Sequence, residues 1–104
     1  MKRPNIARQL AVHVLHRAQR GLCAICGRAV NRKHEMVNFD HVWPKAMLRG
    51  VERTKGNVLL AHTGCNAAKG ARRPTGCEII MLATVNRALG YNEQATARFD
   101  RRFA

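Results

Sequence analysis

The sequence predicts a small α+β domain, in which two short strands and a helix sit on a metal-binding knuckle between flanking helices. Three observations lead to this fold class. Short segments with helical and alternating hydrophobic patterns follow one another without a repeat or a linker. A Cys-x-x-Cys pair stands near the start of the chain. A length of 104 residues allows one domain, which we expect over residues 1–104. The core of such a small domain is thin, and a structural metal would support it.

The first element is a helix at the amino-terminal end. Ile6, Leu10 and Val14 fall on one stripe at helical spacing, which predicts a helix over residues 6–20. Gly21 ends it, because glycine is favoured just beyond a helix.

Two short strands are expected in the middle of the chain. Residues 22–34 form a turn-rich knuckle, and weak alternation over residues 35–40 then predicts the first strand. Pro44 stops further pairing, since proline has no N–H to donate. Residues 45–49 favour a helical turn, and residues 57–61 favour a second strand or turn.

Helices are predicted for the rest of the chain, each bounded by residues that favour helix ends. The first is capped by Thr63 or Gly64 and runs to about residue 71, before Pro74. The second covers residues 78–89, between Thr75 and Gly90. The third covers residues 93–103, after Asn92.

The charge of the chain points to a polyanionic partner. Nineteen Lys and Arg against six Asp and Glu give a formal net charge of +13. Neutralising phosphates releases condensed counterions, so a nucleic acid is the expected partner. A merely basic protein, ribosome-associated or secreted, is the alternative. No signal-peptide pattern and no membrane-spanning run is present, so we expect a cytoplasmic protein without a membrane partner.

The cysteine pattern predicts a zinc site. Cys23 and Cys26 form one close pair, and His62 and Cys65 form a second pair with the same spacing. Zinc prefers four such ligands in a tetrahedron, often supplied as two pairs. A redox dithiol is the alternative, but it usually stands in a thioredoxin-like pattern that is missing here. Cys77 could replace His62 as the fourth ligand.

A second group of polar residues suits phosphodiester hydrolysis, which needs an activated water, a cation and a held phosphate. Neutral His41 can activate water near pH 7. Asp40 and Asn66 offer oxygen ligands for an ion such as Mg²⁺. Neighbouring strand residues point to opposite faces, so Asp40 and His41 can share a site only if the strand ends or bulges there. The candidate phosphate-binding residues are Lys69, on the helix face of Asn66, with Arg72 and Arg73 beyond it.

Three motifs carry a resemblance to a known family. They are Asp40-His41-Val42-x-Pro44, Gly56-Asn57-Val58-x-Leu60 and Cys65-Asn66-x-x-Lys69-Gly70. With the upstream cysteine pair, they resemble the HNH endonuclease family in its zinc-knuckle version, over residues 23–70.

The resemblance implies a fold and a role for each motif residue. It implies the ββα-metal fold, also called the His-Me finger, with His41 as general base and Asp40 and Asn66 as metal ligands. Asn57 matches the middle Asn, which orients the base region through the loop backbone. Asn66 stands where the family name would have His, and His62 stands where these zinc versions usually carry Cys.

The function expected from residues and resemblance together is a divalent-metal-dependent endonuclease acting on double-stranded DNA. Zn²⁺ would be structural and Mg²⁺ or Mn²⁺ catalytic. The alternatives are a catalytically inactive, zinc-stabilised nucleic-acid-binding module and a zinc-stabilised RNA- or ribosome-binding protein. The small chain resembles stand-alone phage or mobile-element HNH proteins, for which a homodimer, packaging or restriction partners and a host cytoplasm are conceivable.

Overall fold

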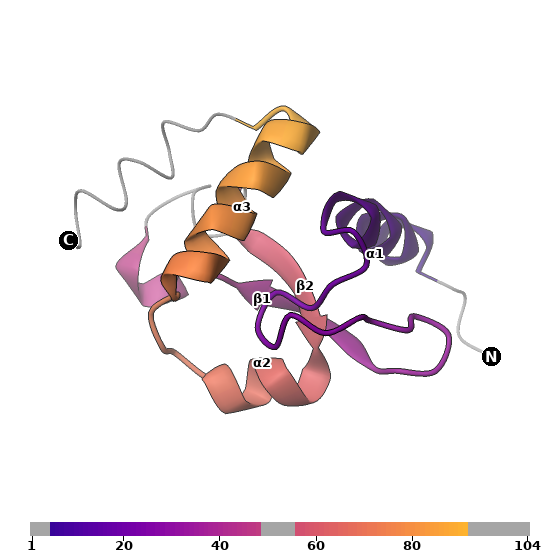
Figure 1. The fold of residues 1–104 in the computed structure, drawn as a ribbon, viewed down its shortest axis with the longest axis horizontal. Coiled ribbons are helices and arrows are strands. Elements are labelled where there is room, and N and C mark those ends of the chain that lie inside the picture. The colour runs from indigo at the N-terminus through magenta and orange to yellow at the C-terminus, as the bar shows by residue number, and fades with distance from the viewer. Residues whose placement is uncertain (1–4, 49–55, 92–104) are drawn as a thin grey trace.

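A computed structural model describes residues 5–48 and 56–91 of the chain (Figure 1). The elements, in order, are α1 (Ile6–Ala18), β1 (Val37–His41), the 3-10 turn η1 (Lys45–Met47), β2 (Val58–His62), α2 (Thr63–Lys69) and α3 (Gly76–Leu89). The α+β class is confirmed, and β1, β2 and α2 form the expected ββα unit. The predicted helix over residues 93–103 lies outside the described residues.

The two strands form an antiparallel hairpin that carries the site. Val37 pairs with His62 and His41 pairs with Val58, which fixes the register between these ends. Each strand lies one or two residues further along the chain than predicted. β1 ends at His41, so Asp40 and His41 are the last two residues of the strand, as a shared site requires.

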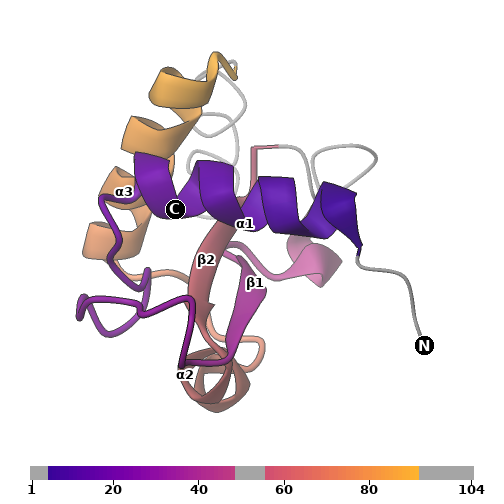
Figure 2. The same cartoon turned by 90° about the vertical axis from the view of Figure 1, so that its right-hand side faces the viewer.

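The main core lies between the hairpin and the helices α1 and α3. Figure 2 shows α1 crossing above the hairpin, with α3 beside it and α2 at the opposite end of the strands. This core is built from buried residues of both helices, of β2 and of the segment after β1, which are Val12, Leu15, Val42, Trp43, Leu48, Leu59, Leu60, Leu82 and Val85, with Ala24 of the knuckle. A smaller cluster of Cys23, Val30 and Ala61 lies under the knuckle.

The helix ends explain most of the observed boundaries. The Thr75 hydroxyl accepts a hydrogen bond from the Glu78 N–H, and the Glu78 carboxylate accepts one from the Thr75 N–H, so this pair starts α3. Gly90, at φ 78°, ends it as predicted. Gly70, at φ 55°, ends α2 slightly before the predicted residue 71.

α1 ends at Ala18 rather than at Arg20 because the next residues leave the helical path. Arg20 and Gly21 both have positive φ values, of 56° and 73°. The Gln19 side chain turns inward, is 3% exposed, and bonds the backbone N–H and C=O of Leu60 in β2. Among the described residues, the helices are too short or too polar to cross a membrane.

Candidate functional site

A tight turn presents the first two cysteines. An isolated bridge between Leu22 and Ala29 closes the knuckle. Within it the Gly27 N–H donates to the Cys23 carbonyl, at 3.1 Å, and Gly27 adopts a φ of 74° that favours glycine. The turn therefore places the Cys23 and Cys26 side chains next to each other.

The knuckle cysteines meet His62 and Cys65, which lie at the junction of β2 and α2. The ligand atoms of Cys23, Cys26, His62 and Cys65 all lie within 4.8 Å of one another. His62 Nδ1 is 3.4 Å from the Cys26 sulfur and 3.8 Å from the Cys65 sulfur. Ligand atoms of a tetrahedral zinc are separated by roughly 3.5–3.8 Å. The predicted cluster therefore has the donor set and the spacing of a zinc site.

The electrostatics of the cluster also fit a cation. Burial opposes ionisation of Cys23, but backbone N–H groups, including those of Cys26 and His62, lower its pKa to about 7. Burial and the neighbouring Cys23 and Cys26 raise the pKa of the Cys65 thiol to about 11. The thiolates thus repel one another, and a bound divalent ion would relieve this repulsion.

The alternative ligand Cys77 does not belong to the cluster. Cys77 is exposed on α3, and the described metal-ligand group contains His62 instead. The structure thus favours His62 over Cys77 as the fourth ligand.

A carboxylate that the sequence reading did not select lies behind His62. Glu35 Oε2 is 2.9 Å from His62 Nε2, on the side of the ring opposite the sulfur atoms. Glu35 Oε1 accepts a hydrogen bond from the Asn31 N–H at 2.6 Å. The strand register explains the contact, because Val37 pairs with His62 and Glu35 lies two residues earlier. Spacing along the sequence alone contains no signal of this pairing.

The residues predicted for phosphodiester hydrolysis line a cavity at the end of β1, separate from the cysteine cluster. This cavity, of about 280 Å³, is lined by Asp40 and His41 from β1, by Asn66 from α2 and by Lys45 after the strand, among others. The Asn66 amide nitrogen lies 3.5 Å from the Phe39 carbonyl oxygen, which brings α2 against β1. The structure therefore brings together the three residues predicted for water activation and metal binding.

Asp40 has one engaged oxygen and one that remains available. Asp40 is 1% exposed, and its Oδ1 accepts a hydrogen bond from Lys69 Nζ at 2.8 Å. Its Oδ2 is buried and has no hydrogen-bond partner among the described residues. A buried carboxylate oxygen without a partner is costly, and a divalent ion would satisfy it. Asp40 therefore fits the predicted role of metal ligand.

Lys69 differs from the expectation that it faces a phosphate. Its side chain is 1% exposed. Besides Asp40, its ammonium bonds the carbonyl oxygens of His41, at 3.0 Å, and Val42, at 2.9 Å. An ammonium has three N–H donors, so these acceptors satisfy it fully. Lys69 shares the helix face of Asn66 as predicted, but its chain turns inward and clamps the end of β1.

The other two candidate phosphate residues lie beyond α2. The Arg72 guanidinium donates to both carboxylate oxygens of Glu78, at 2.9 Å and 3.4 Å, and this bonding raises its pKa. Arg72 therefore connects the segment after α2 to α3, and it does not line the cavity of His41. Arg73 is exposed in the following turn.

Asn57 fixes the loop that follows His41. It is fully buried, its Oδ1 accepts a hydrogen bond from the Trp43 N–H at 2.8 Å, and its Nδ2 donates to the Trp43 carbonyl at 3.0 Å. Its backbone carbonyl accepts a bond from the Val42 N–H. Asn57 thus bonds the residues immediately after His41, although it does not line the cavity.

The environment of His41 keeps its ring neutral. Burial lowers the pKa of His41, and the cations Lys45 and Lys69 lower it further, against the opposing effect of Asp40. A neutral imidazole at neutral pH can accept a proton from water. Lys45, which the sequence reading placed only in a helical turn, thus also belongs to this site.

A ββα unit that carries a metal-type cysteine cluster beside an Asp-His-Asn cavity defines the ββα-metal class. In agreement, residues 23–72 match the family model of the HNH endonuclease, from the knuckle to just beyond α2. This segment, just under half of the chain, is similar to an HNH domain. No curated protein matches the chain.

Proposed function

We propose that the protein is a divalent-metal-dependent endonuclease that hydrolyses DNA phosphodiester bonds. The observation that carries this proposal is the buried, unpartnered Oδ2 of Asp40 in the same cavity as neutral His41 and Asn66. A protein that only binds nucleic acid gains nothing from burying such an oxygen beside a base. The charge of +13 and the family match support a nucleic-acid partner.

In this proposal His41 is the general base. Its imidazole takes a proton from the attacking water, and its lowered pKa keeps the accepting nitrogen free at neutral pH. Asn57 and Lys69 act on the same loop from two sides, because they bond the backbone of Trp43 and of His41 and Val42. They hold His41 in place without touching the substrate.

Asp40 and Asn66 would hold the catalytic ion, Mg²⁺ or Mn²⁺. Such an ion is commonly held by one or two protein ligands and keeps several waters. Once bound, it would stabilise negative charge on the phosphate and on the leaving oxygen. Lys45, exposed at the cavity, replaces Lys69 as the proposed phosphate contact. The Cys23, Cys26, His62 and Cys65 cluster would hold a structural zinc.

One observation favours the alternative of an inactive nucleic-acid-binding module. The Lys69 ammonium already neutralises part of the Asp40 charge, which weakens the attraction of this carboxylate for a divalent ion. In a binding module the Lys69–Asp40 pair would simply hold α2 against β1. Cleavage, and not binding, separates the two functions.

The test is conversion of supercoiled plasmid by the purified protein with Mg²⁺ or Mn²⁺, with EDTA as a control. His41→Ala removes the proposed base, and His34→Ala, an exposed loop histidine, is the matched control. Removing a general base typically costs about 10²–10⁴-fold in rate. We expect nicked or linear DNA from the parent protein and His34→Ala, and none from His41→Ala or with EDTA.

Two results would contradict the proposal. Equal cleavage by His41→Ala and the parent protein would mean that another base or another protein cuts the plasmid. Tight plasmid binding without cleavage in either ion would support the binding module.

A further inference from the structure

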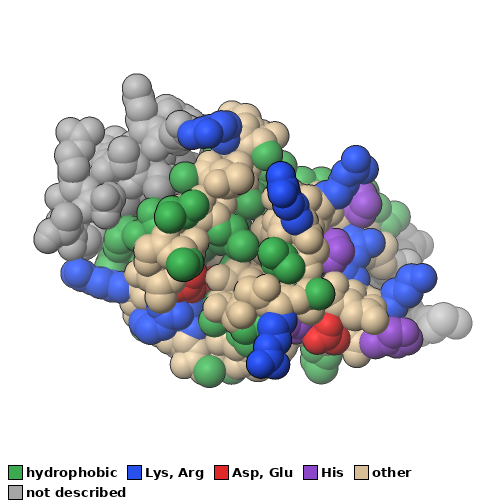
Figure 3. All heavy atoms as spheres, in the orientation of Figure 1, with side chains coloured by type: hydrophobic (Ala, Val, Ile, Leu, Met, Phe, Trp, Pro, Cys, Tyr) green, Lys and Arg blue, Asp and Glu red, His purple; other side chains and the backbone are tan. Residues whose placement is uncertain are grey.

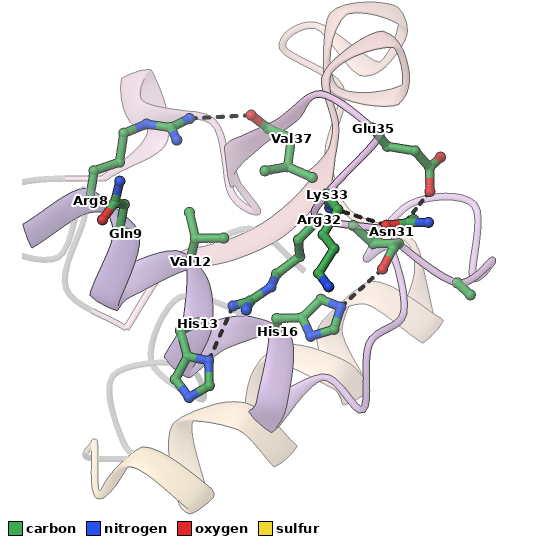
Figure 4. A pocket seen from close by; sticks show the side chains of 12 residues that line it. Arg8, Gln9, Val12, His13, His16, Asn31, Arg32, Lys33, Glu35 and Val37 are labelled. Carbon is green, nitrogen blue, oxygen red and sulfur yellow. Dashed lines mark hydrogen bonds between the residues drawn. The ribbon is translucent and has the colours of Figure 1, made fainter. Parts of the chain in front are cut away.

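A second and larger concavity lies between α1 and the segment that leads into β1. It has a volume of about 900 Å³, against about 280 Å³ for the cavity of His41. One wall is a stripe of α1, and the other is formed by residues 29–37 (Figure 4). We refer to it as the α1 groove. Figure 3 shows Lys, Arg and His side chains gathered on the side of the molecule that these two segments form.

The charged side chains of the α1 groove are mainly cationic. Arg8, Arg32 and Lys33 line it, and Glu35 is its one acidic lining residue. The Glu35 carboxylate is engaged by the Asn31 N–H and by His62, so it does not pair with these cations. Arg32 and Lys33 are exposed, and no described side chain forms an ion pair with either of them.

Two of the cations are held in position by neighbouring groups. Arg32 Nη1 lies 3.2 Å from His13 Nδ1, so the guanidinium can donate to this ring nitrogen across the groove. Arg8 donates to the Val37 carbonyl at 3.2 Å, and its guanidinium carbon lies 5.3 Å from the centre of the Phe39 ring. Each arginine keeps further N–H donors, because a guanidinium has five.

β1 connects the α1 groove with the cavity of His41. Val37 lines the groove, whereas Phe39 and His41 line the cavity. Alternate residues of a strand share one face, so these three side chains follow one another along β1. Residues 37 and 41 are about 13 Å apart at 3.3 Å per residue. This distance corresponds to the rise of roughly four nucleotides in duplex DNA.

We propose that the α1 groove, whose edge at Val37 lies about 13 Å along β1 from His41, binds the phosphate backbone of duplex DNA. Arg32 and Lys33 contact the phosphates, and His13 positions Arg32. This inference rests on the proposed function, because it names the surface that holds the same substrate away from the cavity. The cations of the groove determine what it binds.

The test is the salt dependence of binding to a duplex DNA, measured in buffer without added Mg²⁺ or Mn²⁺ and without a chelator, so that the proposed cleavage is not supported and the cysteine cluster keeps its metal. Arg32→Gln/Lys33→Gln removes two groove cations. Arg17→Gln/Arg20→Gln is the matched control, since it removes the same charge from exposed positions outside the groove. Each lost phosphate contact reduces the slope of log K against log salt by about 0.9. We expect a reduction of about two in the groove variant and a slope close to the parent value in the control.

Equal slopes for the two double variants would overturn the proposal, because charge alone would then explain the effect. Lys33→Gln alone should lower the slope by about one. Its side chain makes no hydrogen bond to a described residue, so this variant should fold normally. Failure of the parent protein to bind DNA would overturn both the groove and the proposed function. Normal parent binding with an unchanged groove-variant slope would overturn the groove alone.

Discussion

The cysteine cluster and the His41 cavity are held together in opposite ways. The cluster places three sulfur atoms and an imidazole together, and the neighbouring cysteines oppose the ionisation of Cys65. This donor set suits a cation from outside the chain. The cavity has its own internal cation, Lys69, and its loop is bonded by Asn57. The comparison indicates that the cluster would be completed by a metal ion, whereas the cavity is organised by the chain itself.

Removing a cluster ligand gives the largest expected effect. Cys65→Ser should abolish metal binding and the cooperative thermal unfolding transition, because binding of structural zinc supplies folding free energy directly. Cys77→Ser, which changes an exposed cysteine outside the cluster, should retain both. Metal content per chain and circular dichroism on heating provide the measurements. A Cys65→Ser protein that keeps zinc and folds normally would contradict the role given to the cluster.

Removing Lys69, the internal cation, should give the next largest loss of stability. This loss should not depend on whether metal is bound to the cysteine cluster. Lys69→Met leaves the buried Asp40 carboxylate uncompensated, so the free energy of unfolding should fall by about 3–5 kcal/mol. Lys45→Met, at an exposed position of the same cavity, should change it by less than about 0.5 kcal/mol. Denaturant titration measures both.

A double variant sharpens this prediction. Asp40→Asn/Lys69→Met removes both charges and should recover part of the lost stability. If Lys69→Met were no less stable than Lys45→Met, the description of the cavity as organised by an internal cation would be wrong.

Glu35 tests whether the cluster also has support from the chain. Its carboxylate lies 2.9 Å from His62 Nε2, while Nδ1 of the same ring faces the cysteine sulfur atoms. Loss of such a partner typically weakens metal binding by about 10–100-fold. In a chelator competition, Glu35→Ala should lower the zinc affinity by this factor. Glu35→Gln should lower it less, and Lys33→Ala should leave it unchanged. Unchanged zinc affinity in Glu35→Ala would show that the ligands alone orient the ring.

The smallest expected effect is a shift in the pH profile of cleavage. Burial and Lys45 lower the pKa of His41 from its ordinary value of 6.5. A base acts in its neutral form, so kcat/KM should rise with pH, with its inflection below 6.5. Lys45→Gln removes one cation and should move the rise to higher pH. An identical inflection in Lys45→Gln would exclude this contribution of Lys45.

The sequence predicted those features of the fold and of the site that depend on local signals. Helix ends followed from Thr75 and Gly90, and the cysteine cluster followed from two pairs with equal spacing. The direction of the Lys69 side chain could not be predicted in the same way. Helical spacing gives the face on which a residue lies, but not whether a long side chain turns toward solvent or toward the strand end. The contact of Glu35 with His62 required the register of the hairpin, which residue spacing does not contain.

The Gln19 side chain has a consequence for how copies of this protein behave in concentrated solution. A hairpin of two strands has an outer edge whose N–H and C=O groups can pair with a strand of another molecule. At Leu60 these groups are already bonded, since the Gln19 amide accepts from the N–H and donates to the C=O. The Ala24 N–H also donates to this carbonyl. A side-chain amide thus imitates a neighbouring strand and protects β2 from the edge-to-edge pairing that begins aggregation.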